Sequence, residues 1–146
     1  GDKGTEKQFD ALQKKYPRQI GVFFGFDKEL AHLIEAGSDI FIMPSRYEPC
    51  GLNQMYSMRY GTIPVVRATG GLDDTVEDYS GNGKGTGFKF EKFDAKELLK
   101  AIQRALKVFH QPEEWKKLMR NGMTKDFSWE HSAKQYMSLY KELLKQ

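Results

Sequence analysis

The chain has 146 residues, a mass of 16.8 kDa and a formal net charge of +3, with 39% hydrophobic and 29% charged residues. This composition predicts one globular domain, and the small, evenly spread charge argues against a nucleic-acid groove. The sequence shows no run near the ~20 apolar residues of a membrane span and no leader pattern, while its single cysteine excludes an internal disulfide and fits a reducing compartment.

The N-terminal part predicts two helices with one strand between them. The capping-box pattern that begins at Thr5 predicts a first helix that ends at Pro17. The apolar, partly β-branched run Ile20–Phe24 predicts a buried strand. Asp27 is then expected to cap a second helix, which stops at Gly37.

The middle of the chain continues this alternation. The apolar runs Asp39–Met43 and Ile63–Val66 predict two further strands, and a helix from about Gly51 to Tyr60 is expected to join them. The run Phe88–Phe90 predicts a weaker fourth strand. Strands that are apolar throughout and alternate with helices predict a parallel sheet covered on both faces, which is a Rossmann-like, doubly wound α/β fold.

Three helices are expected in the C-terminal part. The first opens at Asp94-x-x-Glu97, a shorter one carries Trp115, and Ser128 opens the last. The aromatic residues at helical spacing in the last helix are interpreted as a packing stripe. They are Trp129, Tyr136 and Tyr140.

The stretch "SRYEPCGLNQMYSMRYG" follows the run that ends at Met43. Ligands of doubly wound folds bind outside the carboxyl ends of the strands, so this is where a site is expected. Pro49 ends the extended chain, and Gly51 allows a close backbone approach. The turn then presents the free N–H groups of Gly51, Leu52 and Asn53 at the positive end of a helix, which suits a phosphate.

Glu48 is the unusual member of this stretch. A phosphate repels a carboxylate, so Glu48 is expected to face a sugar, either accepting hydrogen bonds from hydroxyl groups or stabilising a developing positive charge. Diphosphate on the helix and hexose on the acid describe a nucleotide sugar. The alternative remains open that Pro49 and Gly51 only shape a turn and that Glu48 is solvated.

The string "PSRYEPCGLNQMYSMRYGTIPVVRATGGLDDTV", residues 44–76, resembles the signature of bacterial glycogen synthases and plant starch synthases. The resemblance extends back through "GFDKELAHLIEAGSDIFIMPS" and forward to "DFSWEHSAKQYMSLY". It implies a GT-B glycosyltransferase that moves glucose from ADP-glucose to the non-reducing end of an α-1,4-glucan, with retention of configuration and without a metal or cofactor. It also implies a cytoplasmic protein, or a plastid one in a plant, with no nucleic-acid or membrane partner.

The same resemblance implies the site residues. Glu48 matches the catalytic acid beside the glucose of the substrate, and Phe26 stands where relatives stack a tyrosine on adenine. Tyr56 replaces a second glutamate of the broader pattern, which is typical of the bacterial and plant enzymes rather than the animal-type ones that use UDP-glucose. Cys50 has the alternative of being only a small buried side chain. The residues expected to bind the substrate are Phe26, Cys50, Gly51, Leu52, Asn53, Gln54, Tyr56, Gly70 and Gly71.

The resemblance further implies that residues 1–146 form part of the C-terminal, nucleotide-sugar-binding domain of a longer protein. The basic residues that clamp the phosphates, the first strands of the domain and the whole N-terminal domain are expected to lie outside it. The chain alone is therefore expected to transfer no glucose and to bind ADP-glucose weakly. Strand edges at Ile20–Phe24 and Asp39–Met43 are expected to associate with other copies or to pair with each other.

Two other functions stay open. The first is a nucleotide-binding module without catalysis. The second is another retaining GT-B enzyme that forms sucrose or trehalose, although those enzymes usually keep the second glutamate that Tyr56 replaces here.

Overall fold

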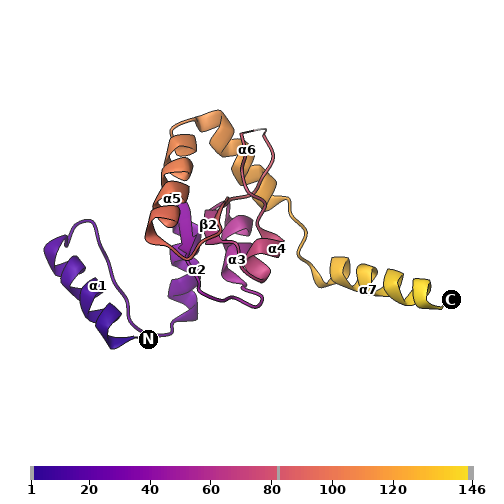
Figure 1. Cartoon of the computed structure of the whole chain (residues 1–146), viewed down its shortest axis with the longest axis horizontal. Coiled ribbons are helices and arrows are strands. Elements are labelled where there is room, and N and C mark those ends of the chain that lie inside the picture. The colour runs from indigo at the N-terminus through magenta and orange to yellow at the C-terminus, as the bar shows by residue number, and fades with distance from the viewer. Residues whose placement is uncertain (1, 82, 145–146) are drawn as a thin grey trace. The chain divides into compact units, whose positions relative to one another are not determined.

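The computed structural model describes residues 2–81 and 83–144. The chain divides into two compact units, Gly1–Ala31 and His32–Gln146, and each is described by itself. The elements along the chain (Figure 1) are α1 (Lys3–Lys15), α2 (Lys28–Gly37), β1 (Ile40–Met43), α3 (Asn53–Tyr60), β2 (Ile63–Arg67), α4 (Gly71–Thr75), β3 (Phe88–Phe90), α5 (Ala95–Phe109), α6 (Pro112–Met123) and α7 (Trp129–Leu143).

Helix α1 begins earlier than its sequence pattern predicts. Asp2 is the N-cap, and its carboxylate accepts hydrogen bonds from the backbone N–H and the hydroxyl of Thr5. The expected cap, Thr5, therefore lies inside the helix, because an aspartate three residues ahead satisfies the same free amide. No described residue of α1 is buried.

The strand predicted at Ile20–Phe24 is wrong, because the segment is irregular in the structure. The backbone N–H of Val22 donates to the side chain of Gln13, and the rings of Phe23 and Phe24 are 57% and 51% exposed. A parallel strand needs a neighbour to complete its hydrogen bonds, and no described strand pairs with this segment. The expected pairing with residues 39–43 and the expected self-association both stay predictions.

The other three strands form one parallel sheet in the order β1-β2-β3. Ile40 of β1 pairs with Ile63 of β2, and Val65 of β2 pairs with Phe88 of β3. These strands confirm the predicted runs to within one residue at their ends. The central strand β2 is buried except at its last residue, while β1 pairs with β2 alone among the described elements.

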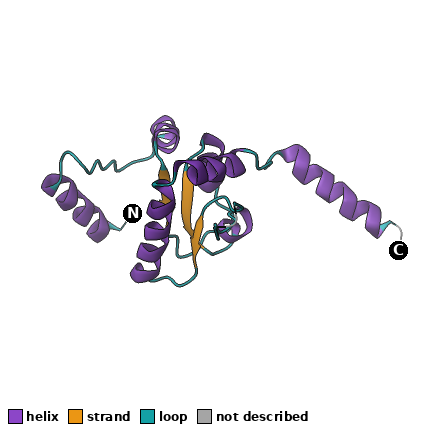
Figure 2. Cartoon of the chain, turned by 90° about the horizontal axis from the view of Figure 1, so that it is seen from above, coloured by secondary structure: helices purple, strands orange, loops and turns teal. Residues whose placement is uncertain are grey.

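Helices cover both faces of the sheet, and Figure 2 shows the strands between them. Val65 belongs to the larger core cluster, which α5 and α6 complete with residues such as Ala105 and Leu118. Val66 points to the opposite face, where it packs with Met58 of α3 and Leu72 of α4. Successive strand residues alternate between faces, and each buried aliphatic side chain contributes about 1.5–3 kcal/mol. The predicted doubly wound fold is confirmed.

The C-terminal helices begin as predicted. Asp94 caps α5 by accepting from the amides of Lys96 and Glu97, and Ser128 caps α7 by accepting from that of His131. The short helix α4 was not predicted, because its five residues are too few to show a helical period.

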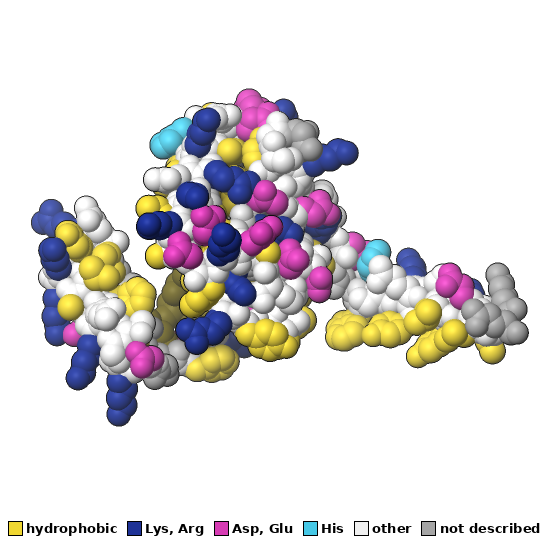
Figure 3. All heavy atoms as spheres, in the orientation of Figure 1, with side chains coloured by type: hydrophobic (Ala, Val, Ile, Leu, Met, Phe, Trp, Pro, Cys, Tyr) yellow, Lys and Arg dark blue, Asp and Glu magenta, His cyan; other side chains and the backbone are white. Residues whose placement is uncertain are grey.

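The aromatic stripe of α7 is not packed in the described structure. No described residue of this helix is buried, and Trp129 is 88% exposed. Figure 3 shows the apolar side chains of α7 gathered along one edge of the helix. The predicted single apolar face is confirmed, whereas its packing is not observed among the described residues.

Candidate functional site

The loop after β1 enters α3 through a turn with unpaired backbone donors. Gly51 has φ +70°, a left-handed conformation that favours glycine, and the N-cap residue Leu52 provides no side-chain cap. The first paired amides are those of Met55 and Tyr56, which both donate to the carbonyl of Leu52. In the described structure no protein group accepts from the four preceding amides, residues 51–54. Four consecutive donors at the positive end of the helix thus have no partner among the described residues, although Gln54, the last of them, is fully buried.

The two glycines before and at the start of α4 hold this loop in place. The amide of Gly71 donates to the carbonyls of Glu48 and Pro49, at 3.1 and 3.2 Å. A Cβ atom on Gly71 would lie 1.8 Å from the carbonyl oxygen of Cys50, and one on Gly70 would lie 2.1 Å from that of Glu48. The expected reason for these glycines was close approach to a ligand. The structure shows a close approach of two backbone segments, and their contact with a substrate stays a prediction.

The buried side chain of Gln54 holds the same turn through hydrogen bonds to its backbone. Its side chain is fully buried, with Nε2 at 3.1 Å from the carbonyl oxygen of Cys50, 2.9 Å from that of Gly51 and 3.0 Å from Oγ1 of Thr75. Thr75 in turn donates to the carbonyl of Gly71. The side chain of Gln54 therefore shapes the turn, and its expected proximity to the nucleotide stays a prediction.

Glu48 has a fixed backbone and an unengaged carboxylate. Its carbonyl accepts from Gly71, whereas no described residue donates to or pairs with its half-buried side chain. An acid in this state remains available to sugar hydroxyls. Next to it, the thiol of Cys50 is exposed, so the alternative of a small buried side chain is wrong.

The start of α3 also contacts α2. The carboxyl of Glu35 on α2 is 2% exposed, and its Oε2 atom has no hydrogen-bond partner among the described residues. Burial raises the pKa of Glu35 above its usual 4.5, although His32 and Asn53 act in the opposite direction. One turn away, the ring of His32 packs against Tyr56 with centroids 5.1 Å apart. Sequence reasoning missed Glu35, because a glutamate on a helix gives no signal that it is buried.

Phe26 belongs to the first unit. Its ring is 96% exposed, so the structure brings it against no other side chain and its expected stacking on adenine stays a prediction. The remaining predicted site residues all belong to the second unit, where the structure gathers Glu48 to Gln54 with Gly70 and Gly71.

Two arginines lie at the carboxyl ends of β1 and β2. The guanidinium groups of Arg46 and Arg67 lie 5.0 and 5.8 Å from the ring centroid of Phe93, and Arg67 donates to the carbonyl of Arg46 at 3.2 Å. Sequence reasoning did not single out Arg46 or Phe93, although both come shortly after strand ends. These cations add positive charge to the edge of the sheet that carries the loop.

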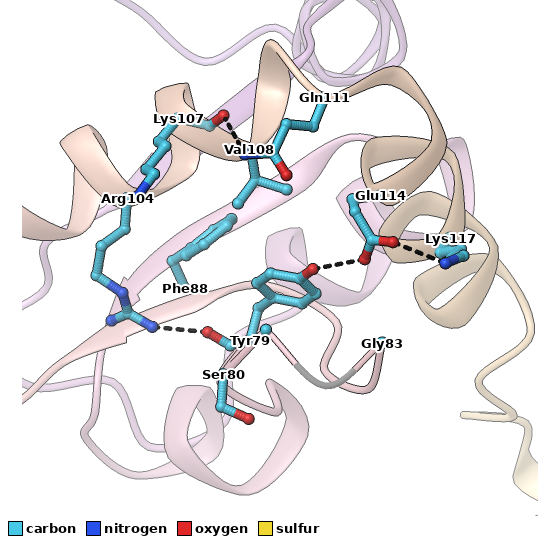
Figure 4. A pocket seen from close by; sticks show the side chains of 11 residues that line it. Tyr79, Ser80, Gly83, Phe88, Arg104, Lys107, Val108, Gln111, Glu114 and Lys117 are labelled. Atoms are coloured by element: carbon cyan, nitrogen blue, oxygen red, sulfur yellow. Dashed lines mark hydrogen bonds and ion pairs between the residues drawn. The ribbon is translucent and has the colours of Figure 1, made fainter.

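A larger hollow lies elsewhere in the described structure. It measures about 800 Å³ and is bordered by α5, α6 and the loop before β3 (Figure 4). Several of its polar groups pair with one another. Tyr79 donates to Glu114 at 2.7 Å, Lys117 pairs with Glu114 at 2.7 Å, and Arg104 donates to the carbonyl of Tyr79 at 2.8 Å. A second hollow of about 500 Å³ borders α3 and includes the predicted residues Leu52 and Tyr56.

A parallel sheet with free helix amides at the carboxyl end of one strand defines a Rossmann-like ligand-binding domain. The profile of the family described as "Glycosyl transferases group 1" matches residues 1–122. The chain belongs to this family of glycosyltransferases, as its sequence resemblance predicted.

Glycogen synthases are among the curated relatives of the chain. The chain is 53% identical over 143 residues to the glycogen synthase of Koribacter versatilis and 54% identical over 144 residues to that of Myxococcus xanthus. The matches cover 97% and 99% of this chain, and the chain spans about 30% of the length of each relative.

The chain is also similar to solved structures of glycosyl-transferring enzymes. The chain is similar to the catalytic domain of starch synthase IV from Arabidopsis thaliana bound to ADP and acarbose, with a TM-score of 0.81 and 37% identity over 96% of this chain and 30% of that one. It is also similar to sucrose-phosphate synthase from Thermosynechococcus elongatus, with a TM-score of 0.66 and 28% identity over 97% of this chain and 35% of that one. The GT-B type of fold and the resemblance to glycogen and starch synthases are confirmed.

Proposed function

We propose that this chain is the nucleotide-sugar-binding part of a glycogen or starch synthase. In this proposal the whole protein transfers glucose from ADP-glucose to the non-reducing end of an α-1,4-glucan, with retention of configuration. The observation that carries it is the row of four unpaired amides at the start of α3, next to an acid without a partner. Identity of 53% to glycogen synthases and the likeness to a starch synthase bound to ADP and acarbose support the choice of substrates.

The proposed roles follow from charge. The diphosphate of ADP-glucose accepts hydrogen bonds from the amides of residues 51–54, and bonds to an anion are about twice as strong as neutral ones. Glu48 then accepts from hydroxyls of the glucose and stabilises the positive charge that develops on the sugar as the bond to phosphate breaks. The arginines at the end of the sheet, Arg46 and Arg67, raise the positive potential around the leaving ADP.

The proposed partners are ADP-glucose, the glucan and an N-terminal domain of the same protein, and no cofactor takes part. None of the helices within residues 2–81 and 83–144 has the length and apolar character needed to cross a bilayer. We place the protein in the cytoplasm, or in the plastid of a plant, on the basis of its single, unpaired cysteine and its relatives.

Titration of the isotopically labelled chain with ADP, followed by NMR, tests the proposed site. The amide signals of residues 51–54 should move with a weak, saturable dependence on ADP, because anions bind to free helix amides. Inorganic phosphate at the same ionic strength is the control. Movement spread evenly over the chain, or none at the start of α3, would contradict the site.

The transfer itself is tested on the full-length parent protein. Glucose from ADP-glucose should be added to maltoheptaose by the parent but not by the 146-residue chain. The variant Glu48→Gln of the parent should bind ADP and lose at least about 10²-fold in turnover, as expected for a group that stabilises transition-state charge. A parent protein that binds ADP without any transfer would instead be a non-catalytic module.

The likeness to sucrose-phosphate synthase supports a second candidate, a transfer of glucose to a fructose phosphate. Offering fructose 6-phosphate and maltoheptaose in competition separates the two. We expect the glucan to be the product, because the identity to glycogen synthases is nearly twice that to the sucrose-phosphate synthase.

A further inference from the structure

Two guanidinium groups share one aromatic ring at the carboxyl end of the sheet. The guanidinium carbon of Arg46 lies 5.0 Å from the ring centroid of Phe93, and that of Arg67 lies 5.8 Å from the same centroid. Arg46 follows β1, Arg67 is the last residue of β2, and Phe93 follows β3. The ends of all three strands thus bring two positive charges to one ring.

Neither of these charges has a counter-ion in the described part of the chain. No ion pair within residues 2–81 and 83–144 joins Arg46 or Arg67 to a carboxylate. Arg67 donates from Nη1 to the carbonyl of Arg46 at 3.2 Å, and its Nε atom is buried without a hydrogen-bond partner. The nearby acid Asp94 caps α5 by accepting from two backbone amides. Most of the N–H donors of the two arginines are therefore unused.

This arrangement costs free energy as long as no anion is bound. Arg67 is partly buried, and a buried N–H without an acceptor loses the hydrogen bonds that it makes in water. Two like charges held beside one ring also repel each other. The cation–π contacts with Phe93 offset only a part of these costs, because its ring is 55% exposed. Polar groups that a fold holds unsatisfied in this way indicate a ligand.

A small hollow borders the same aromatic ring. It measures about 290 Å³, and apart from Phe93 its lining includes the apolar side chains of Pro44, Phe90 and Leu98. Pro44 lies two residues before Arg46, in the loop after β1. An anion held by the two guanidinium groups can therefore carry a small uncharged group that lies against the ring.

The arginine pair is separate from the free amides at the start of α3. Helix α3 packs on the face of the sheet that carries Val66, whereas α5, which begins just after Phe93, packs on the opposite face. The loop from β1 to α3 contacts both sides. Its Arg46 lies against Phe93, and its Glu48 carbonyl accepts from Gly71 at the start of α4. The carboxyl edge of the sheet thus carries two groups of unused donors.

We propose that Arg46, Arg67 and Phe93 form a second anion site, which binds a phosphate dianion, either free or attached to a small sugar. Planar guanidinium groups present their N–H donors in pairs that match phosphate oxygens. A dianion neutralises both charges at once, whereas a single carboxylate would leave one of them without a counter-ion. The site itself does not require a donor at α3, and only the choice of a sugar as the attached group rests on the proposed function.

The experiment titrates the ¹⁵N-labelled chain with inorganic phosphate and, separately, with glucose 6-phosphate, and follows the arginine Nε–H signals by NMR. The signals of Arg46 and Arg67 should move and saturate, while that of Arg120, an exposed arginine of α6, should not. Arg46→Gln should weaken phosphate binding about tenfold, because it removes a charged donor. Arg120→Gln is the matched control and should bind like the wild type. Sodium chloride at the same ionic strength should move neither signal.

The two ligands distinguish the source of the phosphate. Equal affinities identify free phosphate, whereas tighter binding of glucose 6-phosphate that is lost in Phe93→Leu identifies a sugar phosphate. Equal movement of all arginine signals, or unchanged phosphate affinity in Arg46→Gln, would overturn the site.

Failure of the proposed function has a different signature. If ADP leaves the amides at the start of α3 unmoved while phosphate still moves the signals of Arg46 and Arg67, the proposed function is wrong and the second anion site stands.

Discussion

The turn into α3 and the hollow between α5 and α6 differ in what they leave unpaired. The hollow is the larger space, yet Tyr79, Glu114 and Lys117 satisfy one another within it. The turn leaves the amides of residues 51–54 without a partner among the described residues, three of them (51–53) on residues that are not buried, together with the unpaired carboxylate of Glu48. Unsatisfied polar groups therefore indicate a binding site here better than volume does, since paired groups must break bonds before they can hold a ligand.

The strongest test of this comparison is the substitution Gly71→Ala, which disrupts the packing of the loop before α3 against α4. The new Cβ would lie 1.8 Å from the carbonyl oxygen of Cys50, so the loop or α4 must move. We expect a loss of at least about 3 kcal/mol in the free energy of unfolding, measured by urea denaturation, together with loss of the ADP-dependent shifts. Gly37→Ala is the control, because nothing lies within 4 Å of its Cβ position. Equal stability of both variants would contradict the packing.

The next largest effect is expected from Gln54→Leu. This change keeps the volume and removes contacts to three oxygen atoms in a buried position. It should lower the free energy of unfolding by about 3 kcal/mol and weaken ADP binding, because the turn loses its support. Gln103→Leu, at an exposed position of α5, should change stability by less than about 0.5 kcal/mol. Unaltered ADP shifts in Gln54→Leu would show that the turn keeps its shape without this side chain.

Tyr79→Phe tests the hollow instead. It removes the hydroxyl that donates to Glu114 and should lower the free energy of unfolding by about 1 kcal/mol without changing the response to ADP. Tyr136→Phe, on the exposed α7, is the matched control and should be neutral. An altered ADP response in Tyr79→Phe would remove the distinction between the two regions.

The smallest expected effects concern pH, and the two regions should respond in opposite directions. The pKa of Glu35 is raised by burial, so its contribution to stability is complete below about pH 4.5 and is lost as the pH rises through the folded-state value. The pKa of Glu114 is lowered by its bonds to Lys117 and Tyr79. Its contribution is complete above about pH 4.5 and is lost as the pH falls through the folded-state value.

Urea denaturation between pH 3 and pH 8 measures both effects. Glu35→Gln should be more stable than the wild type at pH 7, with a gain that vanishes at low pH. Glu114→Gln should be less stable at pH 7, with a loss that vanishes at low pH. A parallel pH dependence of the two variants would contradict the assignment.

The sequence predicts the strands of the sheet well, but it does not show which apolar segment lacks a strand partner. The apolar runs at residues 39–43 and 63–66 mark buried strands clearly, the three residues Phe88–Phe90 do so more weakly, and all three segments form the sheet. The run Ile20–Phe24 has the same character but forms no strand. Apolar composition shows that a segment tends to be extended, whereas strand formation also requires a partner.

The candidate site also has features that the sequence predicts and features that it does not. Pro49 and Gly51 predict the turn and its free amides, because their effects on the backbone are local. The roles of Gly70, Gly71 and Glu35 depend on contacts with residues distant in sequence, and no local pattern carries that information. Gln54 was expected near the ligand, but its burial became visible only in the folded chain.

The double contact of the Gly71 amide with the carbonyls of Glu48 and Pro49 gives the binding loop a built-in reporter. This hydrogen can exchange with deuterium only when the loop separates from α4, so its exchange rate measures how often the acid-bearing segment opens. A bound nucleotide that clamps the loop would slow this one proton while leaving those of the α5–α6 side unchanged.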